Sequence, residues 1–248
     1  MADRVLVEIL VAAPIETVWK AVRDPREMQR WFGWDYPNLA ADLEMMFAGM
    51  KTVITSDTER TLADEPDRIT FEAVGAQTIV RVIRSAPVTD ETWTGIYSEV
   101  MEGWLTFFHQ LKFVLERHPG ADRRTVYLNG RAASAATPQP AEALGLAPLS
   151  IVPVGERYRI KTATGETLEG TVRYRGSNQL GITVDGYGDG LVVVSARPRT
   201  AKSLHGGGNI IVMTYGLDDA AYARVRERWT KWWRDTYEVI EIQPPADT

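Results

Sequence analysis

The residues that could carry chemistry are few in this chain of 248 residues. The chain has no cysteine, and its histidines, His109, His118 and His205, form no i,i+4 pair and no metal motif with a neighbouring carboxylate. The G-x-S-x-G elbow of many hydrolases is also missing from the sequence. We therefore expect no metal and no cofactor, and we assign no catalytic residue.

Carboxylates and arginines remain as candidates for acid–base or ionic chemistry. Three carboxylates are candidates to face a cavity, where burial would have to shift the pKa of a general acid or base: Asp35, Glu72 and Glu99. Three arginines on expected strands are candidates to reach inward to a ligand carboxylate: Arg81, Arg173 and Arg175. Charged residues on strands more often face solvent, which favours an outward orientation for these arginines.

Aromatic and Met residues form the clearest pattern. Residues 31–50 are aromatic and Met-rich without a clear period, which fits a pocket wall and ordinary core equally well. Aromatic residues also recur at helical spacing in two later segments, and such stripes are more typical of core than of a pocket. From these segments and two expected strands we predict the following ligand-binding residues: Trp31, Trp34, Phe47, Met50, Phe71, Trp104, Phe108, Tyr215, Trp229 and Trp232.

The elements that would position these side chains follow from periodicity. Alternating and β-branched residues predict strands over residues 5–11, 51–62, 68–74, 78–85, 157–162, 168–175, 179–184, 191–196 and 209–215. A 3.6-residue period predicts long helices over residues 97–117 and 218–237, the second with Asp218 as its N-cap. The glycine-rich segments 186–190 and 205–208 open no helix after a strand, so we expect a hairpin and a loop rather than phosphate sites.

The two long helices also indicate an internal repeat. An offset of 125 residues aligns Trp104, Phe107 and Phe108 with Trp229, Trp232 and Trp233. Each helix follows a run of strands joined by short turns, which favours an antiparallel sheet with helices on one face, an α+β fold. We predict domains over residues 1–120 and 153–248, joined by a linker with a short helix over residues 121–152.

Charge and hydropathy limit the partners. Residues 1–120 hold 12 Lys+Arg and 19 Asp+Glu, a net charge of −7, while the remaining residues carry +2 without a dense basic stripe. Nucleic acid is therefore not an expected partner. The longest apolar run near the N-terminus, residues 9–15, is too short for a membrane span or a signal peptide. We expect a cytoplasmic protein, which the absence of cysteine fits.

Residues 7–24, VEILVAAPIETVWKAVRD, resemble the opening of the SRPBCC superfamily (START/Bet v 1-like, helix-grip fold), and more narrowly its AHSA1-like branch. In that branch a strand leads into a Pro-initiated helix with a buried Trp, here Trp19. Residues 102–120 resemble its closing helix, and residues 154–170 resemble its glycine-rich strand pair. The resemblance implies two tandem copies, in each of which an antiparallel sheet grips a long C-terminal helix. The first copy lacks the strand pair, because residues 34–50 are short and irregular.

The resemblance also implies a function. Helix-grip proteins suggest the binding of a hydrophobic or amphipathic small molecule in a cavity between the sheet and the long helix. The alternatives are a cyclase/aromatase-type enzyme of the same superfamily and a protein-interaction module like the Hsp90 activator. Adjacent aromatic residues such as Phe107 and Phe108 cannot both face one sheet, which leaves an interdomain contact or a homodimer open.

Overall fold

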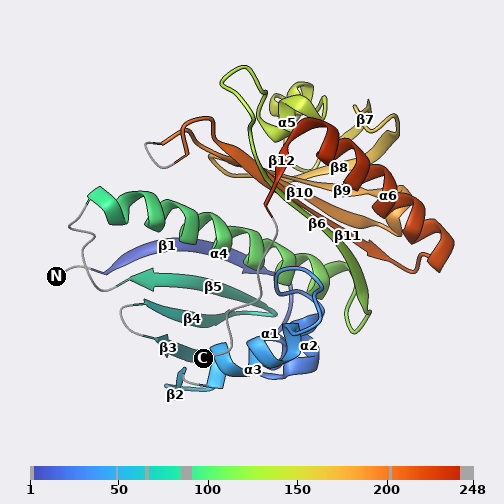
Figure 1. The fold of residues 1–248 in the computed structure, drawn as a ribbon. Helices are drawn as coiled ribbons and strands as arrows, with labels where there is room; N and C mark the ends of the chain where they lie inside the picture. The colour runs from blue at the N-terminus through green and yellow to red at the C-terminus, as the bar shows by residue number, and fades with distance from the viewer. Residues whose placement is uncertain (1–2, 49, 65–66, 85–90, 201–202, 241–248) are drawn as a thin grey trace. The chain divides into compact units, whose positions relative to one another are not determined.

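The computed structural model describes residues 3–48, 50–64, 67–84, 91–200 and 203–240, and the chain forms two compact units, Met1–Ala121 and Asp122–Thr248 (Figure 1). Within the described residues, no helix is long and apolar enough to cross a membrane. The same residues contain no group of three or more His, Asp or Glu side chains that could hold a metal ion.

Unit 1 is an antiparallel sheet with three short helices and one long helix. Its elements are β1 (Arg4–Val11), α1 (Ile15–Arg23), α2 (Pro25–Gln29), α3 (Leu39–Ala48), β2 (Lys51–Ile54), β3 (Glu59–Asp64), β4 (Asp67–Val74), β5 (Gln77–Arg84) and α4 (Glu91–Arg117). The strand order is β1-β5-β4-β3-β2, and every pair is antiparallel. Residues 51–62 were expected as one strand, but they form β2 and most of β3 because the chain turns between them.

The two faces of the unit 1 sheet differ sharply in polarity. Val7, Ile9 and Val11 are buried on one face of β1, here called the core-side face, while the alternate residues face away from it. On the opposite face Arg81 lies between Glu8 and Glu72, at 2.5 Å from a carboxylate oxygen of each. The inward orientation considered for Arg81 and Glu72 is therefore wrong, because strand alternation places both on the charged face.

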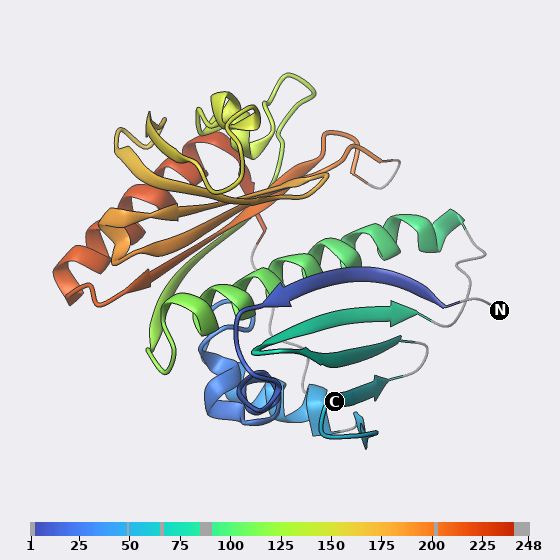
Figure 2. The same ribbon diagram turned by 180° about the vertical axis from the view of Figure 1, so that it is seen from behind.

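The long helix α4 runs along β1, as Figures 1 and 2 both show. Near the C-terminal ends of both elements, Lys112 Nζ donates to the carbonyl of Leu10 at 2.6 Å, and Glu116 accepts from the backbone N–H of Ala12 at 2.9 Å. Because β1 is an edge strand, these bonds satisfy backbone groups that no neighbouring strand can pair. They also fix the direction in which α4 crosses the sheet.

Unit 2 is a larger antiparallel sheet packed against the second long helix. Its elements are β6 (Arg123–Arg131), α5 (Pro140–Ala143), η1 (Ala147–Ser150), β7 (Arg157–Lys161), β8 (Thr167–Arg175), β9 (Gln179–Val184), η2 (Asp185–Tyr187), β10 (Gly190–Arg197), β11 (Gly207–Tyr215), α6 (Asp219–Thr236) and β12 (Glu238–Val239). The strand order is β12-β6-β11-β10-β9-β8-β7. The linker expected over residues 121–152 is corrected here, since β6 lies inside the sheet and pairs with β11 along its whole length.

The two units share one topology. In each unit the first strand pairs with the last strand before the long helix, which gives β1–β5 before α4 and β6–β11 before α6. The next strands then follow in reverse chain order, β5-β4-β3-β2 and β11-β10-β9-β8, with β7 and β12 added at the outer edges of unit 2. The α+β fold with a duplicated antiparallel sheet and long closing helix is confirmed.

Local capping signals place the second long helix. The Asp218 side chain accepts from the backbone N–H of Ala221 at 2.7 Å, which confirms the expected N-cap. Segment 186–190 forms η2 and the turn into β10, with Gly188 in the left-handed conformation at φ +70°. This confirms the expected hairpin between β9 and β10.

Candidate functional site

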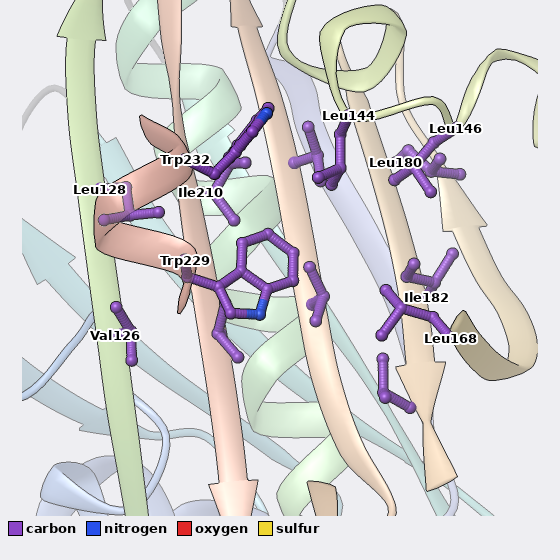
Figure 3. Packing of buried hydrophobic residues seen from close by; sticks show 14 of the residues in the cluster. Val126, Leu128, Leu144, Leu146, Leu168, Leu180, Ile182, Ile210, Trp229 and Trp232 are labelled. Atoms are coloured by element: carbon purple, nitrogen blue, oxygen red, sulfur yellow. The ribbon is translucent and has the colours of Figure 1, made fainter. Parts of the chain in front are cut away.

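The space between helix and sheet in unit 2 is filled by side chains. Figure 3 shows Trp229 and Trp232 reaching from α6 toward the sheet, where they pack in one cluster with Val126, Leu128 and Ile210. Trp229 is fully buried and Trp232 is buried as well. These two predicted ligand-binding residues therefore lie in the packed core of unit 2.

Tyr215 lies on the other side of that sheet. Val212 of β11 belongs to the cluster beneath α6, and Tyr215 is three residues further along the same strand. Because side chains alternate between faces along a strand, an odd separation places Tyr215 on the face opposite Val212. The structure thus does not bring Tyr215 together with Trp229 and Trp232.

A chain of polar contacts ties α6 to the loops at one end of the sheet. The indole N–H of Trp229 donates to the Tyr187 hydroxyl at 2.7 Å, which in turn donates to Glu166 Oε2 at 2.6 Å. Glu166 Oε1 lies 2.7 Å from Nη1 of Arg228. Burial, reinforced by Glu166, raises the pKa of Tyr187 and keeps its hydroxyl protonated. The buried Trp229 and Tyr187 are thus paired with each other and with the half-buried Glu166 and Arg228, which is the arrangement of a structural tie.

The far edge of the unit 2 sheet is also covered. Leu144, Leu146 and Leu149, from the α5–η1 segment, are buried in the same cluster as Leu168 of β8. Arg175, which was considered as a contact for a ligand carboxylate, donates instead from Nη2 to the Leu149 carbonyl at 2.7 Å. This arginine therefore pins the covering segment to the sheet.

The edge strand of unit 1, β2, is exposed to solvent. Counted from β1 and β6, β2 takes the place in unit 1 that β8 takes in unit 2, where one further strand, β7, lies outside β8 and forms the edge. Ile54 pairs with Arg60, which pairs with Phe71, so all three lie on the core-side face of the sheet. Yet all four residues of β2 are exposed, and Ile54 is 61% exposed. On β8 the inward residue Leu168 is only 1% exposed.

A buried arginine lies directly beside this open edge. Arg60 is 8% exposed, and its guanidinium carbon lies 5.4 Å from the centroid of the half-buried Trp19 ring. Both Nη groups bind the Glu16 carboxylate, with Nη1 at 2.9 Å from Oε2, and Arg60 Nε has no hydrogen-bond partner among the described residues. The hydrogen bond from Arg60 lowers the pKa of the Glu16 carboxyl.

Phe71 completes this group, because its buried ring meets Trp19 edge to face at 5.4 Å between centroids. We call Trp19, Thr52, Ile54, Arg60 and Phe71 the β2–β3 site. Of these residues the sequence analysis had singled out only Phe71 for ligand binding. One signal for Arg60 was available, since it lies two residues before the buried Leu62 and so shares its face of β3.

A second aromatic group joins the segment after α2 to the helix α4. Phe32 packs on Phe107 at 4.4 Å, and Trp104 lies 5.4 Å from Phe108, all measured between ring centroids. Trp31 is fully enclosed, and its indole N–H donates to the Ala21 carbonyl at 2.8 Å. Trp31 and Phe108 are therefore core residues, whereas Trp104 and Phe107 remain half-buried.

The other predicted residues of unit 1 lie around α3. Trp34 is half-buried, and its ring centroid lies 6.3 Å from that of Tyr36. Met50 is half-buried between α3 and β2, while the Phe47 side chain lies outside the described residues. Of the candidate acids, Asp35 is exposed to solvent, and the Glu99 side chain also lies outside the described residues.

Comparisons with known proteins add a set of distant structural likenesses. No family model and no curated protein matches this chain. Among solved structures, the di-domain ARO/CYC protein BexL from the BE-7585A biosynthetic pathway is 13% identical, with 98% of this chain and 100% of that chain covered and a TM-score of 0.34. The Aha1 dimer from Colwellia psychrerythraea is 17% identical over 48% of this chain and 100% of that chain, with a TM-score of 0.33. Protein SSP2350 from Staphylococcus saprophyticus is 19% identical over 47% of this chain and 92% of that chain, with a TM-score of 0.33. The fold class accordingly follows from this chain's own strand order and helices.

Proposed function

We propose that unit 1 binds an amphipathic small molecule at the β2–β3 site and that unit 2 is a filled copy of the same fold. One observation carries the proposal, namely the difference between equivalent strands. Ile54 faces the core side of its sheet and is 61% exposed, whereas in unit 2 both Leu168 on β8 and Tyr158 on the edge strand β7 are buried in the core cluster. An apolar side chain that lies on a core-side face and is mostly exposed to solvent favours an apolar ligand group.

The chemistry around Ile54 supports an amphipathic rather than a purely apolar ligand. Trp19 and Phe71 supply aromatic surface next to it, and Arg60 supplies a fixed positive charge. Burying a side chain the size of Ile54 contributes about 1.5–3 kcal/mol, and an aromatic contact adds about 0.5–1.5 kcal/mol. These contributions suit reversible binding of a small molecule.

Binding is favoured over catalysis by the residues that the site holds. Among the five residues that define the site, the ionisable one is Arg60, and it is paired with Glu16. Two of the carboxylates considered as general acids or bases do not join them, because Glu72 pairs with Arg81 on the opposite face and Asp35 is exposed. A cyclase or aromatase would need a positioned acid or base at the ligand.

A titration of the full chain with the neutral fluorescent probe N-phenyl-1-naphthylamine tests the proposal. We expect saturable binding that Ile54→Ser weakens by about tenfold, because the substitution removes about 1.4 kcal/mol or more of apolar contact. The matched control is Ile151→Ser, which changes an isoleucine that is 86% exposed in unit 2. Absence of saturable binding, or an equal effect of the two substitutions, would contradict the proposal.

A further inference from the structure

Building on the proposed function, we infer that the β2–β3 site takes a carboxylate attached to an apolar group and that this carboxylate binds Arg60 in place of Glu16. The inference names the chemical class of the ligand. It starts from the position of Arg60 on the sheet and from the incomplete pairing of its guanidinium group.

The position of Arg60 is unusual for a residue kept only for packing. On the core-side face Arg60 is paired with Phe71, which is followed across the sheet by Val80 and Ile9, and these three apolar residues are all buried. Removing a guanidinium from water is costly, and an apolar residue of similar size at such a position is commonly neutral or stabilising. Arg60 in this apolar row therefore suggests a role beyond holding the sheet together.

The hydrogen bonds of Arg60 leave capacity for a ligand. A guanidinium carries five N–H donors, and a carboxylate binds two of them at once in the bidentate arrangement. Glu16 occupies one donor on each Nη, and Nε–H is buried without a partner among the described residues. A ligand carboxylate can take over both Nη contacts, or it can bind Nε and Nη2 side by side.

Glu16 is well placed to be exchanged. It lies in the first turn of α1, and its side chain is 72% exposed although it is bound to Arg60. A carboxylate that is already mostly hydrated loses little interaction free energy when it returns fully to water. The ligand carboxylate would meanwhile keep the buried guanidinium neutralised, so the exchange would leave no uncompensated charge.

The neighbours of Arg60 specify the remainder of the ligand. The Trp19 ring lies against the guanidinium, and Ile54, directly opposite on β2, faces the same side and is exposed to solvent. An apolar group attached close to the carboxylate would cover Ile54 while the carboxylate reaches Arg60. This arrangement fits a naphthoate-like aromatic acid or a short-chain aliphatic acid.

Calorimetric titration of the full chain with 2-naphthoate and with its neutral counterpart 2-naphthalenemethanol tests the inference. We expect 2-naphthoate to bind at least about tenfold more tightly than the alcohol, since charge-assisted hydrogen bonds favour the anion. Arg60→Met should bring the affinities for the two probes together, because it removes the group that distinguishes the anion from the alcohol. Glu16→Gln should strengthen naphthoate binding several-fold, because it removes the competing carboxylate. The control is Arg81→Met, which removes an ion-paired arginine from the opposite face of the same sheet.

The outcomes separate this inference from the proposed function. Equal affinity for the two probes, with no effect of Arg60→Met, would overturn the carboxylate assignment and leave small-molecule binding intact. Failure of both probes to bind would overturn both. If Arg60→Met does not fold, Glu16→Gln decides the question, because an unchanged or weakened affinity for 2-naphthoate in that variant would also overturn the inference.

Discussion

The polar tie beneath α6 makes a quantitative prediction for Tyr187→Phe. This substitution removes one oxygen atom and leaves the ring in place. The hydroxyl accepts from Trp229 Nε1 at 2.7 Å and donates to Glu166 Oε2 at 2.6 Å, so two hydrogen bonds are lost together. The buried indole N–H of Trp229 is then left without its acceptor.

The magnitude follows from these two losses. A hydrogen bond to a charged acceptor contributes about 1.5–3 kcal/mol, and an unpaired buried donor costs about 1–3 kcal/mol. Glu166 keeps its ion pair with Arg228, and its side chain is 21% exposed, so water replaces part of what it loses. We therefore expect Tyr187→Phe to lower the free energy of unfolding of unit 2 by about 2–4 kcal/mol.

Native-state hydrogen exchange of the β10 and β11 amides in the full chain measures this change within unit 2. The control is Tyr222→Phe, which removes a hydroxyl that donates to the neutral Thr125 carbonyl at 2.7 Å and keeps the ring over which Arg124 lies. We expect that control to cost about 1 kcal/mol. A loss below about 1 kcal/mol for Tyr187→Phe, or equal losses for the two variants, would refute the reasoning that the tie is strong.

Two further predictions concern stability. Burial raises the pKa values of four tyrosines of unit 2, namely Tyr127, Tyr158, Tyr187 and Tyr237. The pKa of Tyr127 rises to about 12. Unfolded tyrosines ionise near pH 10, so the free energy of unfolding should be constant just below that pH and fall as the pH rises above it. Urea unfolding midpoints between pH 8 and 12 measure this dependence, and a flat profile would contradict it. Gly181→Ala should destabilise unit 2 by about 1–3 kcal/mol, because the new Cβ would lie 2.1 Å from the Tyr174 ring. Gly103→Ala on α4 places its Cβ in open space and should stabilise unit 1 by about 0.5–1 kcal/mol. Thermal melts of both variants test these opposite signs.

The parts of the fold that were predictable from sequence depend on local signals. The strand over residues 179–184 and the N-cap Asp218 are examples, because alternation, flanking turns and a capping side chain all lie within a few residues. The strand β6 was missed for the opposite reason. Its partner β11 lies about 80 residues later, and the Ala- and Pro-rich segment that follows β6 dominates the local composition. Residues 123–131 therefore form a strand through their pairing with a segment that is distant in the sequence.

The candidate site was less predictable than the fold, because the register of strand pairing decides on which face of the sheet a side chain lies. The aromatic periodicity correctly placed Trp229 and Phe108 on buried helix faces, but periodicity alone does not distinguish a packed core from a pocket wall. Arg60 and Ile54 were missed because each belongs to the core-side face only through the pairing of β2 with β3 and of β3 with β4. Arg81 likewise faces outward because strand alternation and pairing place it on the charged face next to Glu8.

The duplication itself explains why one copy is filled and the other is open. Both units insert a segment between their first and second strands, the helices α1–α3 in unit 1 and the α5–η1 segment in unit 2. In unit 2 this segment delivers Leu144 and Leu146 to the far edge of the sheet, and α6 fills the remaining space with bulky tryptophans. In unit 1 the helix α1 packs near β4 and β5 through Trp19 and Phe71, and the core-side residues of β2 are exposed to solvent. Since the two units share the strand order from the first strand to β2 or β8, the difference lies in where the inserted segment packs.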